Sequence, residues 1–149
     1  MYENILIAID GSLHASRGLA AGLDLAKLTG AKVTVLTVSE PFPVYDLASK
    51  MGLLQDATAI ETYTVTCKSV AERILAEAVE AAATKAVAIE SLYIADSSPA
   101  KAILDAAKFR SCDLIVMASH GLSGLERFVI GSQVARVVRS AETDVLVIR

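Results

Sequence analysis

The chain has 149 residues, of which 54% are hydrophobic and 21% charged, and its formal net charge at pH 7 is −3. This composition excludes intrinsic disorder and argues against a nucleic-acid-binding protein. Two cysteines are too few for a disulfide scaffold, and no stretch of about 18 residues lacks charge, so no membrane span is expected. The length predicts one domain over residues 1–149. Because no basic region precedes an apolar run at the N-terminus, we expect a cytoplasmic protein.

Short apolar runs rich in β-branched residues predict five β-strands. They cover residues 5–9, 33–38, 87–94, 114–117 and 145–148. Runs that are apolar on both faces are typical of parallel strands covered by helices on both sides.

Helical patterns fill the intervals between these strands. The first helix is expected from Ser12 to about Thr29, with Gly30 at its end and Leu19, Leu23 and Ala26 on its inward face. Gly18 and Gly22 lie inside this helix, at a cost of about 1 kcal/mol each against alanine. Close packing against a neighbouring element would explain both glycines.

The second helix covers roughly residues 66–86, although its start could lie as early as Thr58. Residues 69–72 have the form of a capping box, and the inward positions recur at four-residue spacing: Val70, Ile74, Ala78 and Ala82. The third helix begins at Ser98-Pro99, a cap followed by proline at the first helical position, and should bury Ala100, Ile103, Leu104 and Ala107. The fourth begins near Ser132, with Val134, Val137 and Val138 inward.

The alternation of strands and helices predicts an α/β fold. We expect a doubly wound, open, Rossmann-like sheet of five parallel strands with helices on both faces. Residues 39–57 remain unassigned and should form a surface excursion on the side where the strands end.

Ligands of such sheets bind outside the carboxyl ends of the strands, and two segments there have an unusual composition. One is residues 8–12; the other begins at Ala118 and ends at Gly131-Ser132. Glycines permit close backbone approach, and a helix start offers free N–H groups, so Gly121, Gly131 and the amides of residues 132–134 could cradle a phosphate. Equally, the glycines could serve tight turns alone, with Ser132 as a simple N-cap. Neither a P-loop nor a G-x-G-x-x-G motif is present.

The spacing of these residues resembles a known family. Residues 118–121, nine further residues and Gly131-Ser132 resemble the universal stress protein pattern glycine-x-x-glycine-x9-glycine-serine/threonine, with Ala118 in place of the first glycine. Residues 5–12, a strand and its aspartate-glycine-serine turn, and the strands at 113–117 and 145–147 resemble the same family. The resemblance covers the whole chain and implies an adenine nucleotide alpha hydrolase-like sheet, usually in a homodimer.

The resemblance also implies the positions of a nucleotide, since some members of the family bind ATP and others do not. The base would be surrounded by Ala8, Ile9, Asp10 and Val38; Met117, Ala118 and His120 would lie near the ribose; and Gly121, Gly131, Ser132, Gln133 and Val134 would hold the phosphates. The methyl group of Ala118 is tolerable unless the backbone there needs a positive φ.

Several single residues have competing interpretations. Asp10 could orient adenine, hold a metal, or cap the turn through the amide of Ser12 or Leu13. For His120 we favour a loop position touching ribose or solvent over a general base. His14 is expected to be exposed, and the two cysteines are expected to be inert.

We therefore expect an adenine-nucleotide (ATP or AMP) binding protein with a regulatory role in stress response. Hydrolysis would be slow at most, with Mg²⁺ or Mn²⁺ held at the phosphates, and no catalytic or metal-ligating residue is nominated. The alternatives are a dimeric adaptor module that binds no nucleotide, and an ATP-dependent enzyme of unrecognised type.

The last strand, residues Asp144 to Ile148, is expected at a sheet edge that a second copy covers in a homodimer.

Overall fold

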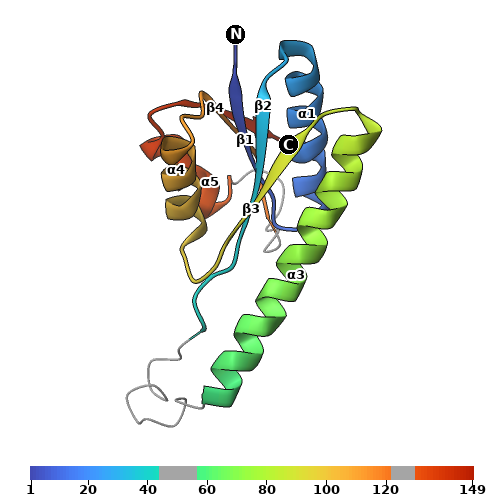
Figure 1. The fold of residues 1–149 in the computed structure, drawn as a ribbon. Coiled ribbons are helices and arrows are strands. Elements are labelled where there is room, and N and C mark those ends of the chain that lie inside the picture. The colour runs from blue at the N-terminus through green and yellow to red at the C-terminus, as the bar shows by residue number, and fades with distance from the viewer. Residues whose placement is uncertain (44–56, 122–129) are drawn as a thin grey trace.

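The computed structural model describes residues 1–43, 57–121 and 130–149, in which strands and helices alternate (Figure 1). The elements are β1 (Asn4–Ala8), α1 (Leu13–Thr29), β2 (Lys32–Val38), α3 (Ala57–Thr84), β3 (Ile89–Ile94), α4 (Pro99–Phe109), β4 (Leu114–Ala118), α5 (Ser132–Ser140) and β5 (Asp144–Ile148). Among the described helices, none is both long and apolar enough to cross a membrane.

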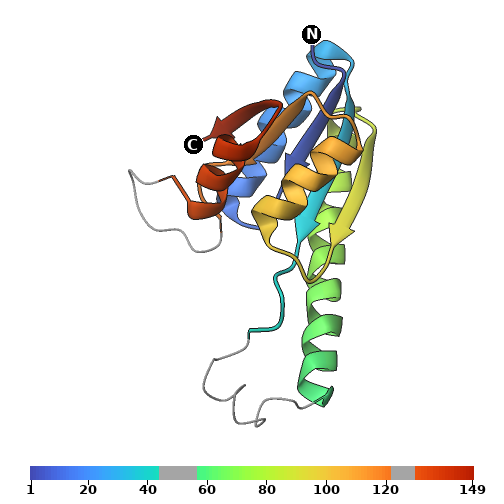
Figure 2. The same ribbon diagram turned by 90° about the vertical axis from the view of Figure 1, so that its left-hand side faces the viewer.

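The five strands form one parallel sheet in the order β3-β2-β1-β4-β5, so the predicted fold class is confirmed. Helices α1 and α3 cover one face and α4 and α5 the other (Figure 2). Because side chains alternate along a strand, Ile5 and Ile7 of β1 join the α1/α3 core, whereas Leu6 joins the α4/α5 core. The strand order reverses between β1 and β4, which places the switch point of the sheet there.

Both ends of α1 agree with the sequence prediction. The Ser12 hydroxyl accepts a hydrogen bond from the Ala15 amide at 3.1 Å, which satisfies one of the free amides of the first turn. Gly30 adopts the left-handed conformation with φ of 75° and donates its amide to the Ala26 carbonyl at 2.8 Å.

The glycines inside α1 allow the helix to lie directly on the sheet. A Cβ atom added to Gly22 would stand 2.6 Å from Cδ1 of Ile7, and one added to Gly18 would stand 3.3 Å from the Ala118 amide nitrogen. The close packing expected at these positions is therefore confirmed. It also sets α1 directly against the end of β4.

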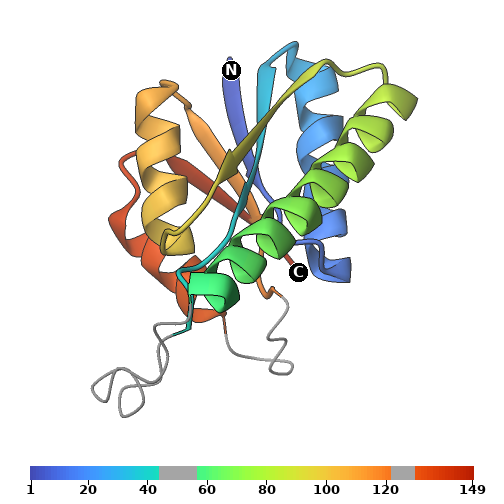
Figure 3. The same ribbon diagram turned by 60° about the horizontal axis from the view of Figure 1, so that its bottom comes forward.

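Helix α3 is longer than its periodicity indicated. It begins at Ala57, close to the earlier of the two starts considered, so Ser69 lies in its interior and the predicted capping box is wrong. The N-terminal half projects beyond the sheet (Figures 1 and 3), and the buried stripe begins only at Ala71. Val70, expected inward, is 40% exposed because it precedes this stripe and lies to one side of it.

Two details of the later helices also differ from expectation. The N-cap of α5 is Gly131, and Ser132 is the first helical residue. Val138 is 50% exposed, because Val134 and Val137 already occupy the narrow stripe that faces the sheet. Leu104 of α4 is half-buried rather than part of the fully buried core.

Replacing Gly22 tests the packing of α1. Gly22→Val forces a branched side chain against Ile7, which is fully buried, so the free energy of unfolding should fall by about 1–3 kcal/mol. Arg17→Val introduces the same residue at an exposed site of the helix, and should change the free energy of unfolding by less than about 0.5 kcal/mol. Urea denaturation of both variants measures the difference, and equal effects would contradict the packing argument.

Candidate functional site

A cavity of about 520 Å³ lies at the carboxyl ends of β1, β2 and β4, beside the switch point. The first residues of α4 and α5 and the side of α3 complete its wall. Of the twelve nucleotide-site residues predicted from the sequence, eleven line it: Ala8, Ile9, Asp10, Val38, Met117, Ala118, His120, Gly121, Ser132, Gln133 and Val134. The structure thus brings together segments that are more than a hundred residues apart in the chain.

Gly131, the twelfth predicted residue, does not line the cavity. Its amide donates to the Ser119 carbonyl at 2.9 Å, and a Cβ atom added to it would stand 3.3 Å from that same oxygen. The glycine therefore permits a close contact between two backbone segments. It holds the start of α5 against the end of β4.

Asp10 and Gly121 lie in contact at the mouth of the cavity. One carboxylate oxygen of Asp10, Oδ1, accepts a hydrogen bond from the Ser12 amide at 2.9 Å. The turn-capping role considered for Asp10 is thus confirmed. A Cβ atom on Gly121 would collide with the other carboxylate oxygen, Oδ2, so only glycine fits there without a shift of Asp10.

The first turn of α5, residues 132–134, lines the cavity and carries free backbone amides. The first hydrogen bond within the helix runs from the Ala135 amide to the Gly131 carbonyl at 2.9 Å. The amides of residues 132–134 precede it, and no group in the described ranges accepts from them. Free amides and the positive end of the helix dipole together favour an anion. Ser132 is exposed in this turn, where its hydroxyl can add a further donor.

Gln133 also forms a side-chain hydrogen bond to α4 that the sequence did not indicate. Its side-chain oxygen accepts a hydrogen bond from the Ala100 amide at 3.0 Å, in the first turn of α4. Ser98, the N-cap residue of α4, makes no side-chain capping bond, so Gln133 supplies the missing acceptor. No local pattern could reveal a contact between residues 33 positions apart.

The cavity is also lined by residues that the sequence did not indicate as part of the site. They are Ala15, Leu36, Ser39, Glu40, Tyr63, Cys67, Pro99 and Ile103. The Tyr63 hydroxyl donates to the Glu40 carbonyl at 2.8 Å, which fixes the chain after β2 against α3. Burial, together with the neighbouring Cys67 thiol, raises the pKa of Tyr63. Tyr63 and Cys67 were missed because the start of α3 was left open and its facing side was unknown.

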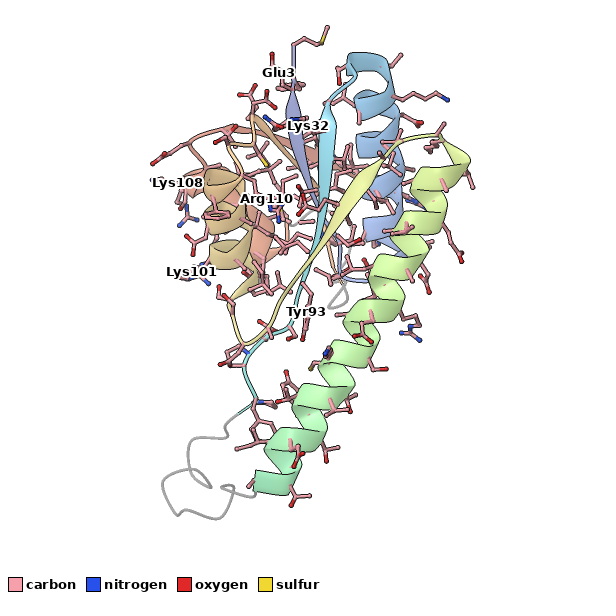
Figure 4. All side chains as sticks on the ribbon, viewed as in Figure 1. Glu3, Lys32, Tyr93, Lys101, Lys108 and Arg110 are labelled. Atoms are coloured by element: carbon pink, nitrogen blue, oxygen red, sulfur yellow. The ribbon has the colours of Figure 1, made fainter. Side chains whose placement is uncertain are left out.

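The end of β3 also joins this region. Tyr93, labelled in Figure 4, shares a hydrogen bond of 2.7 Å with the Ser39 hydroxyl, and the Ser39 amide donates to the Ile94 carbonyl at 3.0 Å. These bonds extend the pairing of β2 and β3 past the regular ladder. They therefore fix Ser39 where it lines the cavity.

The two histidines lie close together. His14, predicted to be exposed, is half-buried, and its ring centroid stands 6.0 Å from that of His120. Nδ1 of His120 lies 3.0 Å from the Ser119 hydroxyl, so a hydroxyl rather than a carboxylate orients this ring. That arrangement differs from the carboxylate-oriented histidine of a general base.

A larger groove, of about 750 Å³, lies at the amino ends of the strands, where Figure 4 labels Lys32 and Arg110. Arg110 pairs there with Glu90 at 2.6 Å, and this hydrogen bond lowers the pKa of Glu90. Ligands of open parallel sheets bind at the opposite end, where the glycine turns and the α5 amides lie. We therefore assign the candidate site to the smaller cavity.

Comparison with known proteins agrees with this geometry. The model of the universal stress protein family matches residues 1–149. This chain belongs to the universal stress protein family. Universal stress protein YxiE of Bacillus subtilis is 34% identical over 150 residues that cover both chains completely, and a universal stress protein of Thermus aquaticus is 34% identical over 155 residues, again with complete coverage.

Solved universal stress proteins share the fold. UspA of Lactobacillus plantarum superposes with a TM-score of 0.73 at 25% identity, covering 99% of this chain and 98% of its own. A universal stress protein in complex with cAMP gives a TM-score of 0.67 at 25% identity, with 99% and 97% covered. One from Archaeoglobus fulgidus in complex with dAMP gives 0.67 at 24% identity, with 99% and 98% covered.

Ala118, the one departure of this universal stress protein from the glycine pattern, causes no backbone strain. It is the last residue of β4 and is paired with Ile148 of β5, so its backbone is extended and needs no positive φ. Its side chain is 7% exposed, at the edge of the cavity.

Gln133→Ala tests the contact between the two helices. Removal of the side chain leaves the Ala100 amide without its acceptor, so the free energy of unfolding should fall by about 1 kcal/mol. Gln133→Glu keeps an acceptor oxygen at the start of α4 and should retain the stability. Thermal and urea unfolding measure both, and a loss of equal size in the two variants would show that the hydrogen bond is not the cause.

Proposed function

We propose that this universal stress protein binds an adenine nucleotide, ATP or AMP, in the cavity at the carboxyl ends of the strands and acts as a regulatory stress protein. The observation that carries the proposal is the pairing, in one cavity of about 520 Å³, of an apolar slot with the free amides of the first turn of α5. A volume of this size falls within the usual range for small-ligand sites.

The two ends of the cavity suit the two ends of a nucleotide. Val38, Met117 and Ile103 give the cavity apolar lining that favours a purine ring, and the Asp10 carboxylate adds a hydrogen-bond acceptor. The amides of α5 favour the phosphates. The family member in complex with cAMP, which shares 25% of its residues with this chain, supports an adenine nucleotide over other anions.

Mg²⁺ or Mn²⁺ would reach this site chiefly through the phosphates. Within the described residues, no group of three or more His, Cys, Asp or Glu side chains is placed to hold a metal ion. The Asp10 carboxylate, which lies against Gly121, is of the ligand type that such hard cations prefer. We propose slow hydrolysis at most, because the His120 ring is oriented by the Ser119 hydroxyl and not by a carboxylate, as the histidine of an efficient general base would be.

Ser132→Asp tests nucleotide binding. The carboxylate would repel phosphates at the first turn of α5, so ATP affinity should fall about tenfold or more, from a dissociation constant in the micromolar to millimolar range. The same carboxylate favours the helix dipole, so the free energy of unfolding should not fall. Isothermal titration calorimetry with ATP and AMP measures the affinity.

Ser132→Ala is the matched control, because it removes the hydroxyl but keeps the amide, and it should weaken binding less than Ser132→Asp. Absence of heat and of a thermal shift for the unaltered protein at millimolar ATP would favour the adaptor module instead. A turnover near 1 per second, which is an ordinary enzyme rate, would favour the ATP-dependent enzyme.

We further propose a homodimer built on β5. The strand lies at the edge of the sheet, and Val145, Leu146, Val147 and Ile148 are only half-buried in the single chain. The Ile148 carbonyl accepts from the Ser119 amide at 2.7 Å and so faces β4. Because backbone groups alternate along a strand, those of Val147 face outward, free to pair with the same strand of a second copy.

Val147→Pro tests this dimer. The variant loses an outward N–H but none that pairs with β4, so it should weaken the dimer more than the fold. Val147→Ala keeps the N–H and should remain dimeric. Ile148→Pro, whose N–H faces β4, should destabilise the fold itself. Light scattering against concentration measures the assembly, and a stable 15.7 kDa monomer of the unaltered chain at high micromolar concentration would refute the dimer.

A further inference from the structure

The two histidines of the chain converge from distant segments. His14 lies in the first turn of α1, and His120 follows β4 and lines the candidate nucleotide cavity. Their ring planes are inclined at 53°, with the centroids 6.0 Å apart. Nδ1 of His14 and Nε2 of His120 are both buried, and neither has a hydrogen-bond partner.

Two buried, unpartnered nitrogens on neighbouring rings need an explanation. A buried polar atom left without a partner costs about 1–3 kcal/mol, and folded proteins contain few of them. The Asp10 carboxylate, although close in sequence to His14, is engaged by the Ser12 amide. A group that satisfies both ring nitrogens at once would remove the penalty.

The Ser119 hydroxyl prepares His120 to act as a metal ligand. It lies 3.0 Å from Nδ1, and when Nδ1–H donates to this oxygen, the lone pair of the neutral ring is on Nε2. Metal-ligating histidines typically have their second ring nitrogen held in this way by an outer hydrogen bond. The nitrogen left free is the one that is buried and unpartnered.

The distance between the rings fits a shared ion. With metal–nitrogen bonds of about 2.0–2.1 Å, two imidazoles on one ion have centroids roughly 5 to 6 Å apart, depending on the angle at the metal. The observed 6.0 Å is at the upper end of this range, so the spacing of the two rings is compatible with a shared ion.

We propose that His14 and His120 form a two-histidine site for Zn²⁺ or another divalent transition-metal ion that imidazole nitrogen binds. Imidazole nitrogen suits zinc, nickel and cobalt, whereas Mg²⁺ prefers oxygen. The described residues offer no group of three ligands, so the remaining coordination positions are open to water. Because His120 also lines the cavity, a phosphate oxygen of the nucleotide can take one of them, and this last step alone rests on the proposed function.

The test uses the full chain without a histidine tag, stripped with a chelator and free of nucleotide. Zn²⁺ titration by calorimetry should show one ion per chain, and His14→Ala and His120→Ala should each lower the affinity tenfold or more. Ser119→Ala leaves both ligands in place but frees the ring of His120, and should lower the affinity about tenfold. Cys67→Ser, which removes the thiol that lines the cavity, is the matched control and should retain the Zn²⁺ affinity.

Two spectroscopic measurements identify the ligands even if a variant fails to fold. In the unaltered chain, Zn²⁺ should shift the NMR signals of Nδ1 of His14 and Nε2 of His120, and bound Co²⁺ should show no thiolate charge-transfer band. Unshifted ring nitrogens, a thiolate band, or unchanged affinity in both histidine variants would overturn the site. ATP binding with Mg²⁺ is measured separately: zinc binding without ATP binding leaves this site standing and refutes the proposed function, and the reverse result refutes the site alone.

Discussion

Ser119, one residue beyond β4, is bonded to three parts of the candidate site. Its amide donates to the Ile148 carbonyl at 2.7 Å, its carbonyl accepts from the Gly131 amide at 2.9 Å, and its hydroxyl lies 3.0 Å from the His120 ring. The residue is 5% exposed, so these bonds are shielded from water and are costly to break. The end of β5, the start of α5 and the orientation of His120 therefore depend on this one position.

Two close backbone approaches complete this junction. Gly131 meets the Ser119 carbonyl, and Gly18 brings α1 against the Ala118 amide one residue earlier. On the opposite side, Gly121 rests against the Asp10 carboxylate, which itself caps the turn into α1. Small residues are needed at these points because three elements converge on the last residues of one strand. The amides of α5 thereby reach the cavity at a fixed position.

Much of this arrangement could be predicted from the sequence because it depends on local patterns. The apolar runs gave the strands, Ser12 and Gly30 marked the ends of α1, and the glycine spacing selected the segments that line the cavity. In each case the signal lies within a few residues of the feature. The residues fall at the carboxyl ends of neighbouring strands, which topology brings together without further information.

The features that were missed depend on contacts between distant segments. Ser69 and Glu72 satisfy a capping pattern, but α3 continues through them because the chain before Ala71 projects past the sheet and is helical there too. The bond from the Ala100 amide to Gln133 and the meeting of the two histidines join parts of the chain that no local pattern relates. Tyr63 and Cys67 likewise become part of the wall only once the direction of α3 is known.

The double use of Gln133 has a mechanical consequence. Its backbone amide belongs to the anion-favouring turn of α5, while its side chain holds the first turn of α4, and the two helices pack along each other. The two helices are therefore joined both by a hydrogen bond and by apolar packing. Helix α4 spans 11 residues and is followed by Arg110, which is paired with Glu90 on the edge strand β3. Helix α4 thus connects the mouth of the cavity with an ion pair at the opposite end of the sheet.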